Sequence, residues 1–355
     1  MRVTSFLFSG LSALSATTHA FSTYNTTNAT SPFSNLTVAI VRAPPANWPS
    51  PFWNKNWTGV EFDLNATISK ATDLISEAAD AGANLVVFPE LWFPGYPKGI
   101  DDAWIASPAA ASYINNSLSI GSPEWRTLLA SAASNGVYLA LAYSELTDSA
   151  IYMGQALISS NGSTLITRRK LRPSGIERSF WSDGDIDGFQ IAETPYGRWG
   201  ILECWEHFHP SMTFPMQAQL EDVHIASFPY MPDANDATAQ YWEALEVNAA
   251  AARTYAVNAG AVTLFAAVGY AAVYDATGLE VASVEQSVDY DERPLLYASV
   301  NATAFRREAY DVDGEQSWGT LQQVVDAFPA YIPKVKGTFV EKKTVLLEDL
   351  WAGIQ

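Results

Sequence analysis

The sequence predicts an α/β fold built from mixed β-sheets with helices on their outer faces. Short apolar runs of strand length alternate along the chain with segments of helical periodicity. Hairpin signals also occur, as at Asn161-Gly162 between two strand-like runs. Hairpins among βα units favour sheets that contain both parallel and antiparallel strands. Because 48% of the residues are hydrophobic and 13% are aromatic, the chain can bury a large core.

In the first half of the chain, strand-like and helical segments follow one another. Ser122-Pro123 is a typical helix start, and Gly136 marks the end of the same helix. The strands are apolar runs without the spacing of a helical face. The expected elements are strand Leu36–Val41, helix Ala66–Ala81, strand Asn84–Phe88, helix Glu124–Ser134, and strands Val137–Tyr143, Gly154–Ser159 and Thr164–Lys170.

The second half repeats this alternation after a loop rich in Gly and Asp over residues 182–188. A long helix is expected from about Ala237 to Asn258, and a shorter one over Pro210–Leu220. The tail after Ala304 is more charged and is not assigned to the core. The expected strands are Tyr196–Leu202, Val223–Phe228, Val262–Ala267, Ala271–Tyr274, Glu280–Val284 and Leu295–Val300.

The charge of the chain limits its partners. A formal net charge of -18 repels phosphate backbones and anionic lipid surfaces, so neither a nucleic acid nor a membrane is expected as a partner. One basic cluster, formed by Arg168, Arg169, Lys170 and Arg172, can attract a small anion. It contains too few cations for a nucleic-acid groove.

The first residues predict a secretory signal peptide over residues 1–20. Arg2 precedes an apolar stretch from Val3 to Leu14, and small residues lead to cleavage after Ala20. This stretch is shorter than the roughly 20 apolar residues that a membrane-spanning helix needs. The protein is therefore expected outside the cell. Residues 21–35 are rich in Ser, Thr and Asn and predict a flexible, glycosylated arm.

Secretion is consistent with the number of glycosylation signals. The chain has a single cysteine, so it cannot form an internal disulfide, and the thiol is either free or intermolecular. Any one acceptor tripeptide also arises by chance. The sequence Asn-x-Ser/Thr occurs at Asn25, Asn28, Asn35, Asn56, Asn65, Asn115, Asn161 and Asn301.

Three reactive side chains each follow a strand-like run. Glu90 follows Val87-Phe88-Pro89, Lys170 ends the run that begins at Thr164, and Cys204 follows Gly200-Ile201-Leu202-Glu203. A carboxylate, an ammonium and a thiol in one cleft supply the groups for covalent attack on a carbon–nitrogen bond. A lone cysteine is otherwise most often a small buried hydrophobic residue, and a lone Glu or Lys a surface charge.

The chain resembles the carbon–nitrogen hydrolase, or nitrilase, superfamily. The Cys-Trp-Glu sequence is similar to the nitrilase branch, as in fungal nitrilases and cyanide hydratases. The resemblance implies a four-layer α-β-β-α sandwich over residues 36–303, with residues 304–355 as a C-terminal extension. The matching segments, in order, are Phe88-Pro89-Glu90, Gly95-Tyr96-Pro97, Tyr143-Ser144-Glu145, Arg169-Lys170-Leu171, Glu177-Arg178 with Trp181, Cys204-Trp205-Glu206 and His224-Ile225-Ala226-Ser227.

The resemblance assigns roles to four residues. It implies that Cys204 is the nucleophile, Glu90 the general base and Lys170 the cation that stabilises the tetrahedral intermediate, and that Glu145 orients the lysine and helps to position water. The chemistry is consistent, because an ammonium favours the thiolate and a carboxylate accepts its proton. No metal or organic cofactor is expected.

Aromatic residues near these motifs predict an apolar substrate pocket, although ordinary core packing is an equally good interpretation for each. His207 stands where nitrilases usually have Asn, and it is expected to alter either the substrate contacts or the ratio of acid to amide. A metal site at His207-Phe208-His209 is disfavoured, because structural zinc requires four suitably spaced ligands. The pocket candidates are Trp92, Phe93, Tyr96, Trp181, Trp205 and His207.

The expected function is that of a secreted nitrilase, which converts a nitrile and water to a carboxylic acid and ammonia through a thioimidate and a thioester. The alternatives are a cyanide or nitrile hydratase that releases an amide, an amidase, and an inactive secreted binding protein with the same fold. The resemblance also implies a homo-oligomer. However, the tail lacks the Gly-His-Tyr segment frequent in the family, and glycans would restrict how copies pack.

Overall fold

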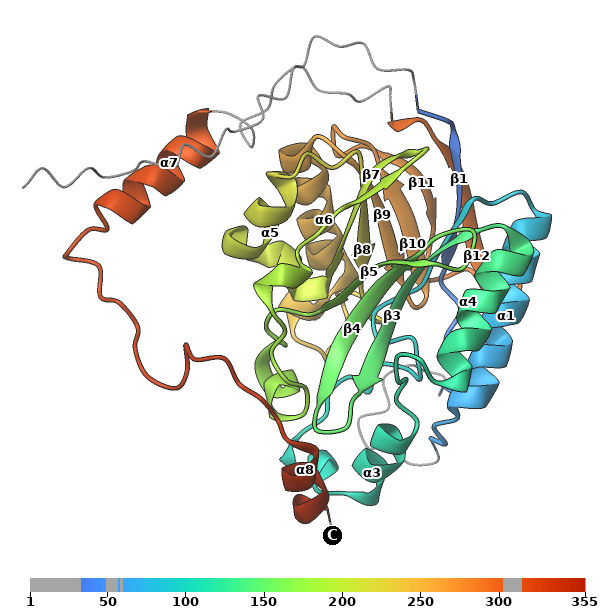
Figure 1. The fold of residues 1–355 in the computed structure, drawn as a ribbon, viewed down its shortest axis with the longest axis horizontal. Helices are drawn as coiled ribbons and strands as arrows, with labels where there is room; N and C mark the ends of the chain where they lie inside the picture. Colours follow the sequence, from blue (N-terminus) through green and yellow to red (C-terminus); the bar gives the residue numbers. More distant parts are fainter. Residues whose placement is uncertain (1–32, 49–56, 58–59, 303–314, 355) are drawn as a thin grey trace, which may run out of the picture. The chain divides into compact units, whose positions relative to one another are not determined.

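The computed structural model describes residues 33–48, 57, 60–302 and 315–354. The expected signal peptide and most of the expected arm lie outside the described residues, as do Asn25, Asn28 and Asn56. The described part consists of two six-stranded sheets with helices packed on them (Figure 1).

The first sheet has the strand order β12-β1-β2-β3-β4-β5. Strands β1, β2 and β3 are parallel, whereas β12, β4 and β5 join as antiparallel strands. The sheet is therefore mixed, as the hairpin signal indicated. The strands are β1 (Leu36–Val41), β2 (Leu85–Val87), β3 (Tyr138–Leu146), β4 (Ile151–Ile158), β5 (Thr164–Arg169) and β12 (Leu295–Val300).

The second sheet has the order β11-β10-β9-β8-β7-β6 and is built on the same plan. Strands β7, β8 and β9 are parallel, and the remaining pairs are antiparallel. The strands are β6 (Ala192–Thr194), β7 (Gly197–Glu203), β8 (Val223–Ser227), β9 (Val262–Ala267), β10 (Tyr270–Tyr274) and β11 (Glu280–Val284).

Helices cover the outer faces of both sheets. Helices α1 (Leu64–Asp80) and α4 (Pro123–Asn135) pack on the first sheet, and α5 (Pro210–Gln217) and α6 (Leu245–Ala259) lie on the second (Figure 1). A further apolar core, with members from both sheets, fills the space between them. The expected α-β-β-α sandwich is therefore confirmed.

Local chemistry explains where the two helices on the first sheet begin. The Asp63 side chain accepts a hydrogen bond from the Ala66 amide, and Ser122 does the same for Trp125. Helix α4 ends at Gly136, whose φ of 66° lies in the left-handed region that favours glycine. Two short helices, α2 (Asp102–Ile105) and α3 (Pro108–Asn115), follow β2 and were not predicted.

The prediction of one long helix over residues 237–258 is wrong at its start. Asp236 accepts hydrogen bonds from the backbone and side chain of Thr238, which form a turn instead of a helix. A short 3₁₀ segment, η4 (Tyr241–Glu243), follows, and the extended Ala244 precedes α6. Apolar spacing alone does not reveal such local side-chain turns.

The C-terminal extension does reach the core, contrary to expectation. Val345 and Leu350 are buried in an apolar cluster with residues of β4 and of the loop before α2. Leu350 belongs to helix α8 (Leu347–Gly353), and helix α7 (Glu315–Asp326) precedes it in the chain. The Val345 amide donates to the Ser182 hydroxyl, and this hydroxyl donates to the Val345 carbonyl.

The sequon asparagines within the described residues are all exposed: Asn35, Asn65, Asn115, Asn161 and Asn301. Among the helices that the structure describes, none combines the length and the apolar character that crossing a bilayer requires.

Candidate active site

The three candidate catalytic residues come together at the ends of β2, β5 and β7. Glu90 lies just after β2, Lys170 directly follows β5, and Cys204 directly follows β7. The Lys170 ammonium donates a hydrogen bond of 2.8 Å to Glu90 Oε1, and both side chains are fully buried. The Cys204 thiol is close enough to Glu90 to lower the pKa of this carboxyl group by hydrogen bonding. The three side chains therefore form one buried cluster.

Cys204 occupies a sharp turn between a strand and a 3₁₀ segment. Strand β7 ends at Glu203, and the segment η3 (Cys204–Phe208) begins at the cysteine, whose φ is +31°. This backbone conformation is rare for a residue with a side chain and is often found at functional sites. The turn directs the thiol out of the sheet toward Glu90.

The Glu206 carboxylate fixes this turn to the strand that carries the lysine. It accepts hydrogen bonds from the Glu203 amide and the Leu171 amide, each at 2.9 Å. It also forms a fully buried ion pair of 2.5 Å with Arg168. The Glu206 carboxylate thus binds Glu203, which precedes Cys204, and also Arg168 and Leu171, which lie on either side of Lys170.

Glu177 lies in one of the matching segments, but the sequence did not reveal its role. Its Oε2 accepts a hydrogen bond of 2.9 Å from the Lys170 ammonium and one of 2.6 Å from the Ser174 amide, and its Oε1 accepts one from the Tyr96 hydroxyl. Ser174 and Glu177 form a capping box at a 3₁₀ turn, and this Ser-x-x-Glu spacing is readable in the sequence. That signal could have distinguished this glutamate from the others.

The role expected for Glu145 requires correction. Both of its carboxylate oxygens bind the Arg169 guanidinium, at 2.6 and 2.7 Å, and the second carboxylate on Lys170 is that of Glu177. The reason is the alternation of side chains along a strand. Arg169 and Lys170 are neighbours in the chain, so they point to opposite faces, and Glu145 meets the face that carries Arg169.

The buried charges shift one another's pKa values. Burial raises the pKa of Glu90 to about 7, although Lys170 opposes the shift. Burial alone would lower the pKa of Lys170, but Glu177 and Glu90 together raise it well above its usual value. Burial and the Glu90 charge raise the pKa of the Cys204 thiol. At neutral pH the site therefore holds a protonated thiol beside a carboxyl group that can accept its proton.

A cavity of about 340 Å³ opens beside these residues. Tyr96 and Trp205 line it, as expected, together with Glu177 and Cys204. Because Lys170 binds Glu90 Oε1, Glu90 Oε2 is the carboxylate oxygen that is available to accept the thiol proton. The other residues of the wall are Lys98, Gly99, Ser174, Gly175, Ile176, Pro229, Met231, Trp242, Glu243 and Asn248.

Three other pocket candidates are core residues instead. Trp92 and Phe93 pack with Phe88 under the first sheet, and the Trp92 indole donates to the Ala43 carbonyl. Trp181 is buried, and its indole donates to the Ser144 hydroxyl. These three aromatic residues therefore pack in the core and do not line the cavity.

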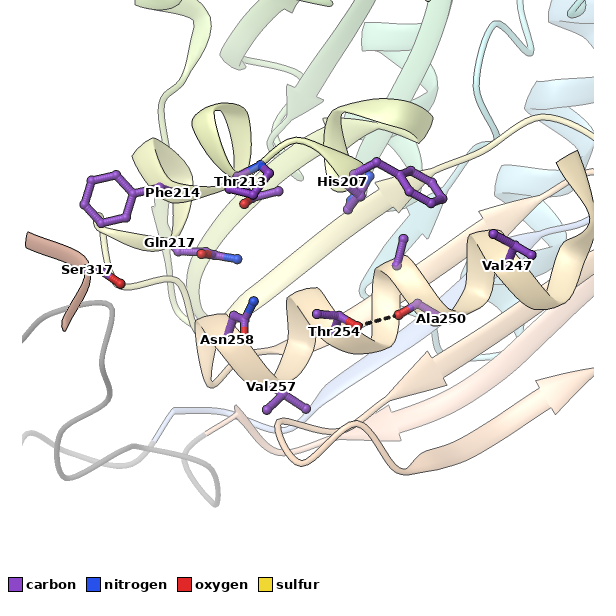
Figure 2. Close-up of a pocket in the computed structure, with 13 residues that line it drawn as sticks. His207, Thr213, Phe214, Gln217, Val247, Ala250, Thr254, Val257, Asn258 and Ser317 are labelled. Atoms are coloured by element: carbon purple, nitrogen blue, oxygen red, sulfur yellow. Dashed lines mark hydrogen bonds between the residues drawn. The ribbon is translucent and has the colours of Figure 1, made fainter. Parts of the chain in front are cut away.

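His207 also lies outside the wall of this cavity, contrary to expectation. Figure 2 shows it at a larger hollow of about 760 Å³, which is lined mainly by residues of η3, α5 and α6. This hollow contains none of the catalytic residues. In the part of the chain that the structure describes, no three His, Cys, Asp or Glu side chains are placed to hold a metal ion.

Two charged residues of the cavity were not anticipated. Lys98 donates a hydrogen bond of 3.2 Å to the Tyr230 carbonyl, and burial lowers the pKa of its ammonium. The Glu243 charge opposes that shift. The cavity wall therefore combines aromatic surface with the Lys98 ammonium and the carboxyl groups of Glu177 and Glu243, which can orient a polar substituent on an otherwise apolar substrate.

Comparison with known sequences identifies relatives. The profile of the family described as carbon–nitrogen hydrolase matches residues 37–306. An arylacetonitrilase of Aspergillus kawachii is 38% identical over 206 residues, which cover 58% of this chain and 63% of that protein. A cyanide hydratase of Stereum hirsutum is 38% identical over 177 residues, which cover 48% and 47%. The chain therefore matches less than two thirds of the length of these curated relatives.

Solved structures of low sequence identity share the fold. Nit3 of Saccharomyces cerevisiae, a member of branch 10 of the nitrilase superfamily, has a TM-score of 0.57 and 16% identity, and the match covers 78% of this chain and 95% of that chain. An amidase from Nesterenkonia sp. has a TM-score of 0.54 and 14% identity, with 78% and 94% covered.

Proposed function

The chain belongs to the carbon–nitrogen hydrolase family, and from this premise we propose that it hydrolyses a nitrile to a carboxylic acid and ammonia. The observation that carries the proposal is the buried cluster of Cys204, Glu90 and Lys170 beside a cavity lined by aromatic residues. Its relatives include an arylacetonitrilase and a bacterial nitrilase, which supports nitriles as the substrate class.

The residues supply each step of this reaction. Glu90 accepts the thiol proton while the Cys204 sulfur attacks the nitrile carbon, which gives a thioimidate. A first water adds to that carbon, the carbon–nitrogen bond breaks, and ammonia is released. The remaining acyl group is bound to the sulfur as a thioester. A second water releases the acid and restores the thiol. Lys170 stabilises the negative charge that develops on the substrate nitrogen or oxygen, and Glu177 holds the ammonium in place.

The cavity favours an aromatic nitrile. Trp205 and Trp242 meet edge to face, with ring centroids 5.0 Å apart, and both line the cavity together with Tyr96 and Met231. Such a wall is suited to a flat apolar group. Its volume of about 340 Å³ is at the small end of the range for ligand pockets, roughly 300–1,000 Å³.

A second candidate product is the amide. Its motivation is the cyanide hydratase among the relatives. The amide forms if the tetrahedral species expels the thiolate before the amine. The two outcomes share the cluster and differ in which bond breaks, and that depends on how the substrate nitrogen is protonated and held.

The test is product analysis with purified, reduced protein. Benzonitrile, phenylacetonitrile, an aliphatic nitrile and cyanide are supplied separately, and ammonia, acid and amide are quantified, with Cys204→Ala as the control. Acid and equimolar ammonia from phenylacetonitrile, lost in the control, is the expected result. Amide without ammonia identifies a hydratase. Consumption of an amide without turnover of any nitrile identifies an amidase. If the protein turns over none of these substrates although its thiol is reduced and reactive, the hypothesis of an inactive binding protein remains.

We also infer that the protein is secreted and glycosylated. The support is the signal-like sequence over residues 1–20 and the exposure of the sequon asparagines within the described residues. The expected result is recovery from the culture medium, with a mass that falls after enzymatic removal of N-linked glycans. Retention inside the cell with the unmodified mass would contradict this inference.

A further inference from the structure

A chain of buried polar side chains ends at the backbone of Cys204. His207 Nδ1 lies 2.8 Å from the Cys204 carbonyl oxygen, and His207 Nε2 lies 3.0 Å from His224 Nε2. His224 Nδ1 is 2.7 Å from Glu221 Oε2, and the Tyr255 hydroxyl donates to Glu221 Oε1 at 2.9 Å. All four side chains are buried, and the proposed reaction uses none of them.

Hydrogen-bond chemistry fixes the direction of each link. A carbonyl oxygen only accepts, so His207 Nδ1 carries the hydrogen. Burial lowers the pKa of His207 well below its usual value, so the ring is neutral and its Nε2 accepts. His224 Nε2 must therefore donate. One further proton is shared between His224 Nδ1 and Glu221. The tautomers follow from this network.

The surrounding residues hold the chain in one arrangement. The Tyr255 ring stacks on the His224 ring with centroids 3.7 Å apart. Gly200 makes room for Glu221, because a Cβ at this position would lie 2.2 Å from Glu221 Oε1. Two of the four residues lie on strand β8 and helix α6, which belong to the rigid part of the second sheet layer. A rigid partner is what a hydrogen bond needs in order to fix a flexible group.

The anchored carbonyl belongs to the residue with the rare backbone conformation. Cys204 has φ of +31°, and its peptide orientation sets the direction of the thiol toward Glu90. His207 does not line the cavity that contains Cys204, so contact with substrate does not explain its burial. His207 lines the hollow between α5 and α6 instead (Figure 2), so it can support the Cys204 backbone without contact with the substrate.

We propose that His207 and His224 are positioning residues, which hold the Cys204 carbonyl through a directed hydrogen-bond chain and so aim the thiol at the substrate. The proposal rests on the proposed role of Cys204 as nucleophile. It assigns to these two histidines an effect on the chemical step and not on substrate binding.

Two variants of His207 separate the two ring nitrogens. In His207→Asn, the amide nitrogen can take the place of Nδ1 and donate to the Cys204 carbonyl, but no atom reaches His224. In His207→Gln, the amide reaches the place of Nε2 and cannot replace Nδ1. His207→Leu removes both links. Because Cys204 is the only cysteine, its alkylation by iodoacetamide can be followed by mass without interference.

We expect His207→Leu and His207→Gln to lower kcat and the alkylation rate by about 10- to 100-fold, with KM changed less than about 2-fold. His207→Asn should retain both rates within about 5-fold. The link between His207 and His224 is tested in the same way. His224→Gln keeps a donor near the place of Nε2, so its kcat and alkylation rate should stay closer to those of the wild type than the values of His224→Leu. Thermal midpoints measured for every variant identify any loss that comes from unfolding.

The proposal is overturned if Gln at position 207 performs as well as Asn, if the loss appears in KM alone, or if His207→Leu alkylates at the wild-type rate. If His207→Leu does not fold, the comparison of Asn with Gln still decides. The alkylation series also separates this proposal from the proposed function. A wild-type protein that turns over no nitrile contradicts the function, whereas its alkylation rates still test the positioning role.

Discussion

The two faces of β5 carry similar ion pairs in different surroundings. On the inner face, Lys170 binds Glu90 and Glu177, and the exposed fractions of the three side chains are 0%, 0% and 8%. On the outer face, the Arg169 side chain is 33% exposed, binds Glu145 and stacks on the Tyr152 ring at 3.7 Å. The side chains of two consecutive residues thus lie in different places: Lys170 in the proposed reaction centre and Arg169 at a partly solvated surface.

The difference shows that a carboxylate and a cation alone do not make a reactive pair: Lys170 and Glu90 are fully buried and lie beside the Cys204 thiol, whereas Arg169 is partly exposed. The inner pair is fully buried, and this burial raises the pKa of Glu90 to about 7 although Lys170 opposes the shift. A cation in such surroundings stabilises developing charge far more strongly than one in contact with water. The same substitution on each face should therefore have very different effects.

The largest contrast is expected between Lys170→Met and Arg169→Met. Loss of the buried ammonium removes the charge that stabilises the intermediate, so kcat should fall by about 10³-fold or more. Arg169→Met should lower kcat by less than about 10-fold, because Arg169 is partly exposed and binds Glu145 instead of Glu90 or Glu177. Steady-state kinetics with the best nitrile substrate measures both. Equal losses would mean that the two faces act as one unit.

The next contrast sets Glu177→Gln against Glu145→Gln. Glu177 fixes Lys170 and accepts the Tyr96 hydroxyl at the cavity wall, so its neutral replacement should lower kcat by about 10²-fold. Glu145→Gln should remain within about 10-fold of the wild type. Kinetics of both variants, with circular dichroism as a control for folding, provides the test. A greater loss from Glu145 would restore the role first expected for it.

The inner face should also impose a pH dependence. Glu90 must be ionised to accept the thiol proton, and burial raises its pKa to about 7. The value of kcat/KM should therefore rise with pH, by about tenfold between roughly pH 6 and pH 8. Because carboxyl and thiol interact, the profile reports the pair. A flat profile over this range would indicate that Glu90 has an ordinary pKa or is not the base.

The smallest effect is expected for stability on the outer face. Partly exposed ion pairs contribute little, so Glu145→Gln should lower the free energy of unfolding by about 1 kcal/mol or less. Urea denaturation of Glu145→Gln, Arg169→Met and the double variant gives the coupling energy. A coupling above about 2 kcal/mol would show that solvent screens this pair less than its exposure indicates.

Much of the fold was predictable from the sequence because it depends on local pattern. Strands β1, β9, β11 and β12 have the predicted bounds, since each is a short apolar or alternating run that ends at turn residues. The predicted start of helix α6, at about Ala237, was too early because the turn at Asp236 depends on a side-chain hydrogen bond. Apolar periodicity does not register such a bond.

The site was predictable only in part. The resemblance brought Glu90, Lys170 and Cys204 forward, and the structure places them together. The resemblance assigned Glu145 to the lysine and gave Glu177 no role, because the motifs do not reveal which carboxylate lies on the same face as Lys170. The role of His207 depends on a partner 17 residues away on β8, a tertiary contact without a local signal.

Hydrogen bonds between the C-terminal extension and the loop after β5 join segments that are synthesised at different times. Arg172 and Arg178, which flank Glu177, donate to backbone carbonyls of residues 339–341, and the Lys343 amide donates to Asp183, 160 residues earlier in the chain. Protein chains emerge from the ribosome in sequence order, and earlier segments fold first. The contacts between the tail and the loop that carries Glu177 can therefore form only after the segments of both sheets have been synthesised.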